Sequence, residues 1–372
     1  MRLSPFIHQW PRFVLELEGE APLVFSPGVR VSGDIELERR WKRRPGFLRL
    51  SVRIANRRST PVRLRSACVF AATEEGQFTD APFPEWRVER LGRNKNDTAG
   101  RFTPSVDDLR LREALLDTSE VPAGNGLRGV ELLDDPKAEA GTAFYADPGL
   151  VLLETGRPGA LFLGFDGQER HLNRICLETT ADRRHLQSLT AEAELDGVLL
   201  APGAERHLHD FILEEADFPE ILLAHHAKRV QRRLGSRFAP FRNLYCTWYY
   251  FGPDIDRAGI LSNLDYIRRA GLPFNAFQID SGWFRTYGDW EPDLGKFPGG
   301  MAEIAAAIRE AGLAPGIWTA PFVLAPDSQA VARHPDLVLR RADGTPCRFV
   351  CDGGQCLVLD PTAPSAPACS PA

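Results

Sequence analysis

The 372-residue sequence has no apolar run approaching the roughly 18 residues that a membrane-spanning helix needs. It begins with no apolar segment leading to a small-residue cleavage site, so we find no secretory signal and expect a cytoplasmic protein. Its net charge of −5 gives no general reason to expect a nucleic acid or a membrane as partner. With 43% apolar and 26% charged residues, the chain has the composition of a globular protein.

Two further absences argue against particular kinds of site. Seven cysteines in a chain of this length form no disulfide framework, and the four nearest the C-terminus show no paired C-x-x-C zinc pattern: Cys347, Cys351, Cys356 and Cys369. We therefore expect reduced thiols and no metal site. No G-x-G-x-x-G turn follows a strand, which argues against a dinucleotide-binding sheet.

The first 217 residues have the pattern of many short strands. In residues 47–54 an alternation places Leu48, Leu50, Val52 and Ile54 on one face. Turn signals such as Ser32-Gly33-Asp34 separate the apolar runs, which is typical of a β-sandwich. Residues 39–65 contain eleven Lys and Arg residues. A nucleic-acid stripe is one interpretation, but the alternation puts Arg49 and Arg53 on the outward face, so we favour a solvated strand face.

In residues 218–240 the spacing of the apolar residues changes from the alternation of a strand to the repeat of a helix. Leu223, Ala227, Val230 and Leu234 recur at helical spacing, and Gly235 is a suitable C-cap. We predict a helix that links two domains. His225 and His226 lie on it without further ligands at metal spacing, so surface or interdomain packing is their expected role.

Residues 241–372 alternate strands and helices. We predict strands over 243–250, 274–280 and 314–320 and helices over 254–270 and 301–311. An Ala-Gly-Leu sequence closes both helices, at 270–272 and 311–313. A repeated βα unit indicates a parallel sheet, either doubly wound or the beginning of a (β/α)8 barrel.

The ends of these strands and the following loops carry aromatic and acidic residues, and in a barrel such ends form the active site. They are Trp248, Tyr249, Tyr250, Phe251, Asp280, Ser281, Gly282, Trp283 and Trp318, joined by Phe284, Tyr287, Asp289, Trp290, Lys296 and Phe297 from the loop 282–298. Flat rings beside carboxylates suit a sugar, which has apolar C–H faces and many hydroxyls. Structural roles are the alternative: the aromatics form ordinary core, Asp280 and Asp289 cap loop amides, and Trp318 fills the barrel interior.

Several motifs in order resemble glycoside hydrolase family 36, the α-galactosidase or melibiase family. They are Cys246-Thr247-Trp248-Tyr249-Tyr250-Phe251, Phe277-Gln278-Ile279-Asp280-Ser281-Gly282-Trp283, Gly288-Asp289-Trp290, Lys296-Phe297-Pro298, Gly316-Ile317-Trp318-Thr319-Ala320-Pro321-Phe322, Pro326-Asp327-Ser328, His334-Pro335-Asp336 and Leu359-Asp360-Pro361-Thr362. The resemblance covers 241–362, and the β-rich front half is similar to the family's N-terminal β-supersandwich. The implied architecture is a sandwich domain over 1–217, a linker helix over 218–240 and a partial (β/α)8 barrel over 241–372 with its first three or four strands.

This resemblance implies a retaining hydrolase that acts on terminal α-galactosides such as melibiose or raffinose, without a metal or organic cofactor, a nucleic-acid partner or a membrane partner. The resemblance is compatible with a homo-oligomer. By motif position it assigns substrate binding to Asp280, Ser281, Trp283, Trp248, Tyr249, Asp289, Trp290 and Trp318.

The chain departs from the family pattern in two ways. Where the family has Asp-Asp-Gly-Trp, this chain has Asp280-Ser281-Gly282-Trp283, so a neutral hydroxyl replaces one carboxylate and the preferred sugar is open. The resemblance also places the nucleophile in a Lys-x-Asp motif beyond residues 359–362, and the acid/base further on, so we assign no catalytic residue. We expect a truncated gene product that is inactive alone. The alternatives are a non-catalytic carbohydrate-binding protein and a fragment of a raffinose-synthase-like transglycosidase.

Overall fold

The structure is a computed structural model that describes residues 13–26, 30–73, 86–91, 100–102, 142–154, 159–182, 186–237, 242–341, 343–351 and 354–366. The described residues fall into two compact units, one ending at residue 237 and the other beginning at residue 242. Cys369 and most of residues 92–141 lie outside the described residues. No described helix is long and apolar enough to cross a membrane.

The first unit consists of two antiparallel sheets. The first has the order β2 (Leu23–Phe25), β1 (Phe13–Leu17), β6 (Val62–Thr73), β13 (Leu186–Leu200), β12 (Leu172–Thr179), β9 (Ala143–Ala146). The second has the order β3 (Val31–Ser32), β4 (Ile35–Arg44), β5 (Phe47–Asn56), β15 (Phe211–Ala216), β11 (Ala160–Phe165), β10 (Gly149–Glu154), β7 (Trp86–Arg90), β8 (Gly100–Phe102), and β14 (Glu205–His207) also pairs with β5. One apolar core joins side chains from both sheets, as in a β-sandwich.

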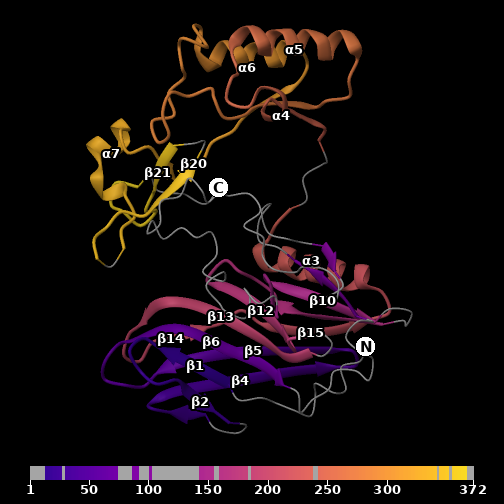
Figure 1. The fold of residues 1–372 in the computed structure, drawn as a ribbon, viewed down its shortest axis with the longest axis vertical. Coiled ribbons are helices and arrows are strands. Elements are labelled where there is room, and N and C mark those ends of the chain that lie inside the picture. Colours follow the sequence, from indigo (N-terminus) through magenta and orange to yellow (C-terminus); the bar gives the residue numbers. More distant parts are fainter. Residues whose placement is uncertain are drawn as a thin grey trace. The chain divides into compact units, whose positions relative to one another are not determined.

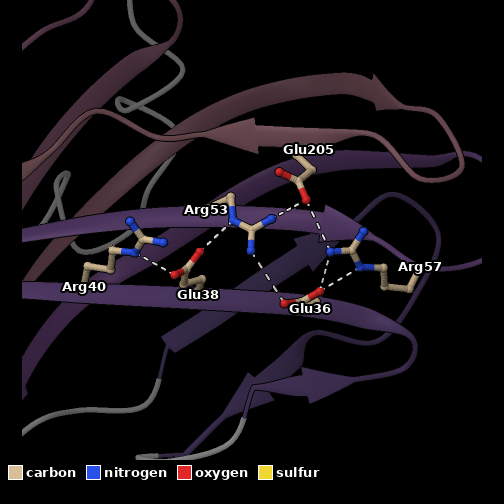
Figure 2. A network of polar contacts seen from close by, with 6 residues as sticks. All are labelled: Glu36, Glu38, Arg40, Arg53, Arg57 and Glu205. Atoms are coloured by element: carbon tan, nitrogen blue, oxygen red, sulfur yellow. Dashed lines mark hydrogen bonds and ion pairs between the residues drawn. The ribbon is translucent and has the colours of Figure 1, made fainter.

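The alternation predicted for residues 47–54 is confirmed. Leu48, Leu50, Val52 and Ile54 are each at most 2% exposed, and they face the core of the sandwich. The opposite face of β5 carries the charged residues. Arg53 lies between Glu36, Glu38 and Glu205, while Arg40 and Arg57 pair with the same carboxylates (Figure 2). This part of the basic stretch is therefore neutralised within the protein.

Helix α3 (Pro219–Leu234) has the predicted position and ends at Gly235 in the left-handed conformation, but its buried face differs from the predicted one. Leu222 is fully buried, whereas Leu234 is 52% exposed. The helix packs beside β10, β11 and β15 of the first unit (Figure 1). Two arginines on the inner face of the helix explain why a different face is buried. Arg229 pairs with Glu214, and Arg233 pairs with Asp166 and Glu169.

The second unit contains a parallel sheet in the order β16 (Leu244–Cys246), β17 (Ala276–Ile279), β18 (Ala314–Ile317). Between these strands run α4 (Trp248–Phe251), α5 (Arg257–Ala270) and α6 (Gly300–Glu310). Helices α5 and α6 lie side by side (Figure 1) and bury Ile260, Leu264, Ile304 and Ile308 in a core with Phe277. The Asp256 carboxylate accepts a hydrogen bond from the Gly259 amide, which fixes the start of α5.

The rest of the second unit is a small antiparallel sheet. Its order is β19 (Val323–Leu324), β21 (Gly354–Val358), β20 (Arg348–Cys351). The short helices α7 (Gln329–Arg333) and η4 (Pro335–Leu337) lie in the chain between β19 and β20. Leu324, Leu337, Val338 and Leu357 form its core. The described residues thus form the two antiparallel sheets of the first unit, followed in the second unit by a parallel β/α segment and this small antiparallel sheet.

Candidate substrate-binding site

The site is built on the carboxyl ends of β16, β17 and β18, which meet at one edge because the strands are parallel. Cys246 pairs with Gln278 in the register. Immediately beyond, the Asp280 amide donates a hydrogen bond of 2.9 Å to the hydroxyl of the fully buried Thr247. The Trp318 amide donates to the Ile279 carbonyl at 2.8 Å, so all three strand ends are tied together.

The Asp280 carboxylate is partly buried and held by three donors. One oxygen accepts from the Cys246 thiol at 3.2 Å and from the Gln278 amide at 3.0 Å, and the other accepts from the Ser281 amide at 2.9 Å. An ionised carboxylate can accept about four hydrogen bonds. The carboxylate is therefore fixed in position and can accept one more hydrogen bond.

Sequence reasoning missed the residues that hold Asp280. Burial raises the pKa of the Cys246 thiol, and the hydrogen bond to Asp280 raises it further. The thiol is thus kept in its neutral, donating form. The contact of Gln278 with Asp280 could have been predicted from the sequence, because residues two apart on a strand share a face. The contact of Cys246 with Asp280 could not, because it depends on the pairing register of β16 with β17.

The turn after Asp280 requires its glycine. Ser281 is 4% exposed and lies within the turn. Gly282 has a φ of +102°, and a Cβ built on it would lie 2.1 Å from the Pro253 carbonyl oxygen. The Lys296 ammonium donates to that same oxygen at 2.9 Å and to the Gly282 carbonyl at 3.3 Å. The loop is therefore clamped against the segment that follows α4.

Five aromatic side chains gather beside this turn. Their ring centroids lie 4.8–6.4 Å apart in the contacts that join them: Trp283, Phe284, Tyr287, Trp290 and Trp318. Trp283 is 5% exposed and donates from its indole N–H to the Trp318 carbonyl at 2.9 Å, which makes it a packing residue in this structure. Trp290 and Trp318 are partly exposed and can offer ring surface to a ligand.

Asp289 has a local structural role. One carboxylate oxygen accepts from the Gln329 amide at 3.1 Å and the other accepts from the Ala330 amide at 2.9 Å, at the start of α7. This is the amide-capping alternative considered for Asp289. Its assignment to substrate binding remains a prediction.

The prediction that residues 243–250 form one strand is wrong at its end. Strand β16 stops at Cys246, and Trp248 and Tyr249 belong to α4, a single turn in which the Gly252 amide donates to the Trp248 carbonyl at 2.9 Å. Trp248 is 38% exposed and Tyr249 is 91% exposed. Both follow the end of β16, and in the described ring contacts neither is paired with a member of the aromatic cluster.

No group of three or more His, Cys, Asp or Glu side chains in the described parts of the chain is arranged to hold a metal ion. The site consists of one oriented carboxylate with aromatic surface beside it. Such an arrangement can bind a polyhydroxylated ligand through a charge-assisted hydrogen bond and ring stacking.

Comparison with solved structures relates this architecture to α-galactosidases. TtGalA, the α-galactosidase of Thermus thermophilus, superposes with a TM-score of 0.54 at 23% identity, covering 94% of this chain and 57% of its own. The α-galactosidase of Lactobacillus brevis gives a TM-score of 0.58 at 14% identity and covers 96% and 50%. At these identities the likeness concerns the fold, and the chain spans about half the length of these enzymes.

Sequence comparison relates residues 225–368 to a known family. Residues 225–368 match the Melibiase family. The α-galactosidase of Escherichia coli is 36% identical over an alignment of 89 residues, which covers 21% of this chain and 13% of that enzyme. AgaA of Geobacillus stearothermophilus is 35% identical over 98 residues, covering 24% and 13%. The resemblance to the GH36 α-galactosidase, or melibiase, family is thus confirmed over residues 225–368, and the chain matches only part of the length of these relatives.

Proposed function

We propose that this chain carries the β-supersandwich and the first strands of the (β/α)8 barrel of an α-galactosidase-type retaining glycoside hydrolase. The match of residues 225–368 to the Melibiase family supports the assignment. The order of elements in the second unit supports it as well, because β16, β17 and β18 alternate with helices as the successive strands of a barrel do.

The proposed ligand is a terminal α-galactoside such as melibiose or raffinose. The observation that carries this proposal is the Asp280 carboxylate, held by three donors at the edge of the parallel sheet with acceptor capacity left over. TtGalA was solved with stachyose and AgaA with raffinose, which shows the ligand class for those enzymes. We assign Asp280 to a sugar hydroxyl, and the partly exposed rings of Trp318 and Trp290 and the exposed ring of Trp248 to its apolar face.

Ser281 distinguishes this chain from the family pattern. A charge-assisted hydrogen bond contributes about 1.5–3 kcal/mol, against roughly 1 kcal/mol for a neutral one. Ser281 is buried in the turn, so it offers a sugar less than a second carboxylate would. We therefore propose weaker binding of galactose than a paired-aspartate site would give.

Hydrolysis with retention requires two carboxyl groups about 5–5.5 Å apart across the anomeric carbon. The family pattern places both after residues 359–362, and no Lys-x-Asp motif follows Thr362 in this sequence. We propose that the 372 residues by themselves bind a galactoside without turning it over.

Titration calorimetry of the full chain with galactose, melibiose and raffinose tests the binding. We expect heat from the unaltered chain and at least a tenfold loss of affinity in Asp280→Ala. Asp265→Ala is the matched control, because this aspartate lies on α5 and pairs only with Arg268 and Arg269 in the described contacts. Equal heat in both variants would contradict the role of Asp280.

An aryl α-galactoside assay tests the absence of turnover separately. We expect no release of the aryl group by the purified chain. A retaining hydrolase activity that copurifies with the chain and is lost in Asp280→Ala would refute the proposal that the chain is inactive. It would still support the role of Asp280 in binding.

A further inference from the structure

The outward face of the β4–β5 hairpin has two ends that differ in charge balance. At one end the arginines meet Glu36, Glu38 and Glu205 (Figure 2). At the other end, next to the turn at residues 45–46, Lys42 lies directly opposite Arg49 in the antiparallel register. Like charges directly opposite each other on two strands repel. A ligand of opposite charge would relieve this repulsion.

Helix α3 adds further cations beside this end of the hairpin and forms one wall of an open cavity of about 540 Å³ within the first unit. The cavity is lined by six cations: Lys42, Arg44, Arg49, Lys228, Arg229 and Arg232. Glu214 is the one carboxylate in its lining, in a chain whose overall charge is −5. The positive charge is thus local and concentrated.

Glu214 does not neutralise the cavity. One of its oxygens lies 2.7 Å from the His225 Nδ1, and the other accepts a hydrogen bond from the Arg229 guanidinium. Arg49 has a longer contact of 3.5 Å with Asp210, which does not line the cavity. Within the described part of the chain, the remaining four cations have no carboxylate partner: Lys42, Arg44, Lys228 and Arg232.

We propose that this cavity binds a small anion that carries at least two phosphate groups. Guanidinium groups match phosphate oxygens in a bidentate manner, and the cations stand on two walls, the hairpin and the helix. A ligand with two separated anionic groups meets both walls at once. The volume lies in the range of about 300–1,000 Å³ typical of small-molecule sites.

The same features disfavour an extended polyanion. A nucleic acid or a membrane surface is bound by a continuous stripe of unpaired cations. Here the basic stretch is interrupted, because Arg40, Arg53 and Arg57 along the same strands are already paired. The concave cluster at the α3 end is therefore the part of the stretch that is open to a ligand.

Titration calorimetry of the full chain with inorganic pyrophosphate tests the proposal, with orthophosphate as the comparison. We expect saturable binding of one pyrophosphate per chain, at least tenfold tighter than orthophosphate and weakened by added sodium chloride. Absence of saturable pyrophosphate binding at low ionic strength would overturn the proposal. Binding of a nucleic-acid oligomer or of anionic phospholipid vesicles without pyrophosphate binding would overturn it as well.

A pair of charge reversals locates the binding. Arg232→Glu changes the lining of the cavity, whereas Arg237→Glu makes the same charge change at an exposed residue just beyond α3 and outside the lining. We expect at least a tenfold loss of pyrophosphate affinity in Arg232→Glu and less than a twofold change in Arg237→Glu. Lys228→Glu, also exposed on the helix, repeats the test if Arg232→Glu loses the native circular dichroism spectrum. Equal affinities in the cavity variant and the control would show that pyrophosphate binds elsewhere.

Discussion

His171 makes the stability of the first unit sensitive to acid. It is 8% exposed, both of its ring nitrogens are buried without a hydrogen-bond partner among the described residues, and its ring stacks on that of His209 at 4.2 Å. Burial, and then the neighbouring His209, Arg206 and Arg170, lower the pKa of His171 to about 3. The folded state therefore holds this ring neutral well below the pH at which the unfolded chain protonates it.

His209 adds to the effect. Its Nδ1 accepts from the Asn173 amide at 2.8 Å, which places the ring proton on Nε2, 3.3 Å from a Glu169 carboxylate oxygen. Burial nevertheless lowers the pKa of His209 to about 4, although Glu169 opposes the shift. Both rings are thus neutral in the fold at pH 5.

The size of the effect follows from proton linkage. Below pH 6.5 the unfolded chain binds a proton at residue 171 that the folded chain does not, so the free energy of unfolding falls as the pH falls. With a pKa that moves from 6.5 to about 3, the loss from His171 alone is about 2 kcal/mol at pH 5, at about 1.4 kcal/mol per pH unit. This is a large part of a typical domain stability of about 5–15 kcal/mol.

The variant His171→Phe keeps an aromatic ring in this position and removes the titration. We expect the free energy of unfolding to fall between pH 7 and pH 5 by about 2 kcal/mol less in the variant than in the parent. Urea unfolding followed by far-UV circular dichroism measures it, and His171→Leu serves if phenylalanine is too large. His207→Gln, at an exposed histidine on β14, is the control. An unchanged pH dependence in both His171 variants would refute the reasoning.

Three further outcomes follow from the second unit. Gly282→Ala should abolish or strongly weaken galactoside binding in calorimetry, because its methyl group would meet the Pro253 carbonyl at 2.1 Å and displace the turn beside Asp280. Cys246→Ser should keep galactoside affinity, and Cys246→Ala should lower it several-fold, because only serine preserves a donor to the Asp280 carboxylate. Ile308→Ala should destabilise the unit by about 2–5 kcal/mol in urea unfolding, against about 0.5–1.5 kcal/mol for Ile308→Val, because Ile308 is 1% exposed.

The sequence predicts the fold best where one physical pattern dominates. The alternation in residues 47–54 identified the buried face of β5, because a sandwich strand has one apolar side and one solvated side. The prediction of the buried face of α3 is wrong because carboxylates of the first unit draw Arg229 and Arg233 inward. Hydrophobic periodicity cannot detect that attraction, since Glu214 and Asp166 are brought to the helix only by the tertiary structure.

In the candidate site, too, the sequence predicts some features and the tertiary structure determines the others. Trp283, Trp290 and Trp318 lie together beside the turn that follows Asp280, because parallel strands bring their carboxyl ends to one edge and the loop 282–298 folds over it. The roles within the group follow from contacts that one sequence does not contain. Trp283 is buried with its N–H bonded to a carbonyl, and Asp289 caps α7, so two of the predicted ligand contacts are engaged in holding the loop.

The end of β16 shows why a strand end is hard to place. Residues 243–250 are rich in aromatics, which favours a strand. Thr247, however, uses its hydroxyl to accept from the Asp280 amide and its carbonyl to accept from the Phe251 amide at 3.0 Å. Because that second bond closes a helical turn, the chain leaves the sheet one residue after Cys246 and presents Trp248 and Tyr249 to solvent. The bond that orients Asp280 uses the Thr247 side chain and the turn that exposes these rings uses its backbone carbonyl, so Thr247→Val is expected to remove the first bond and to keep the second.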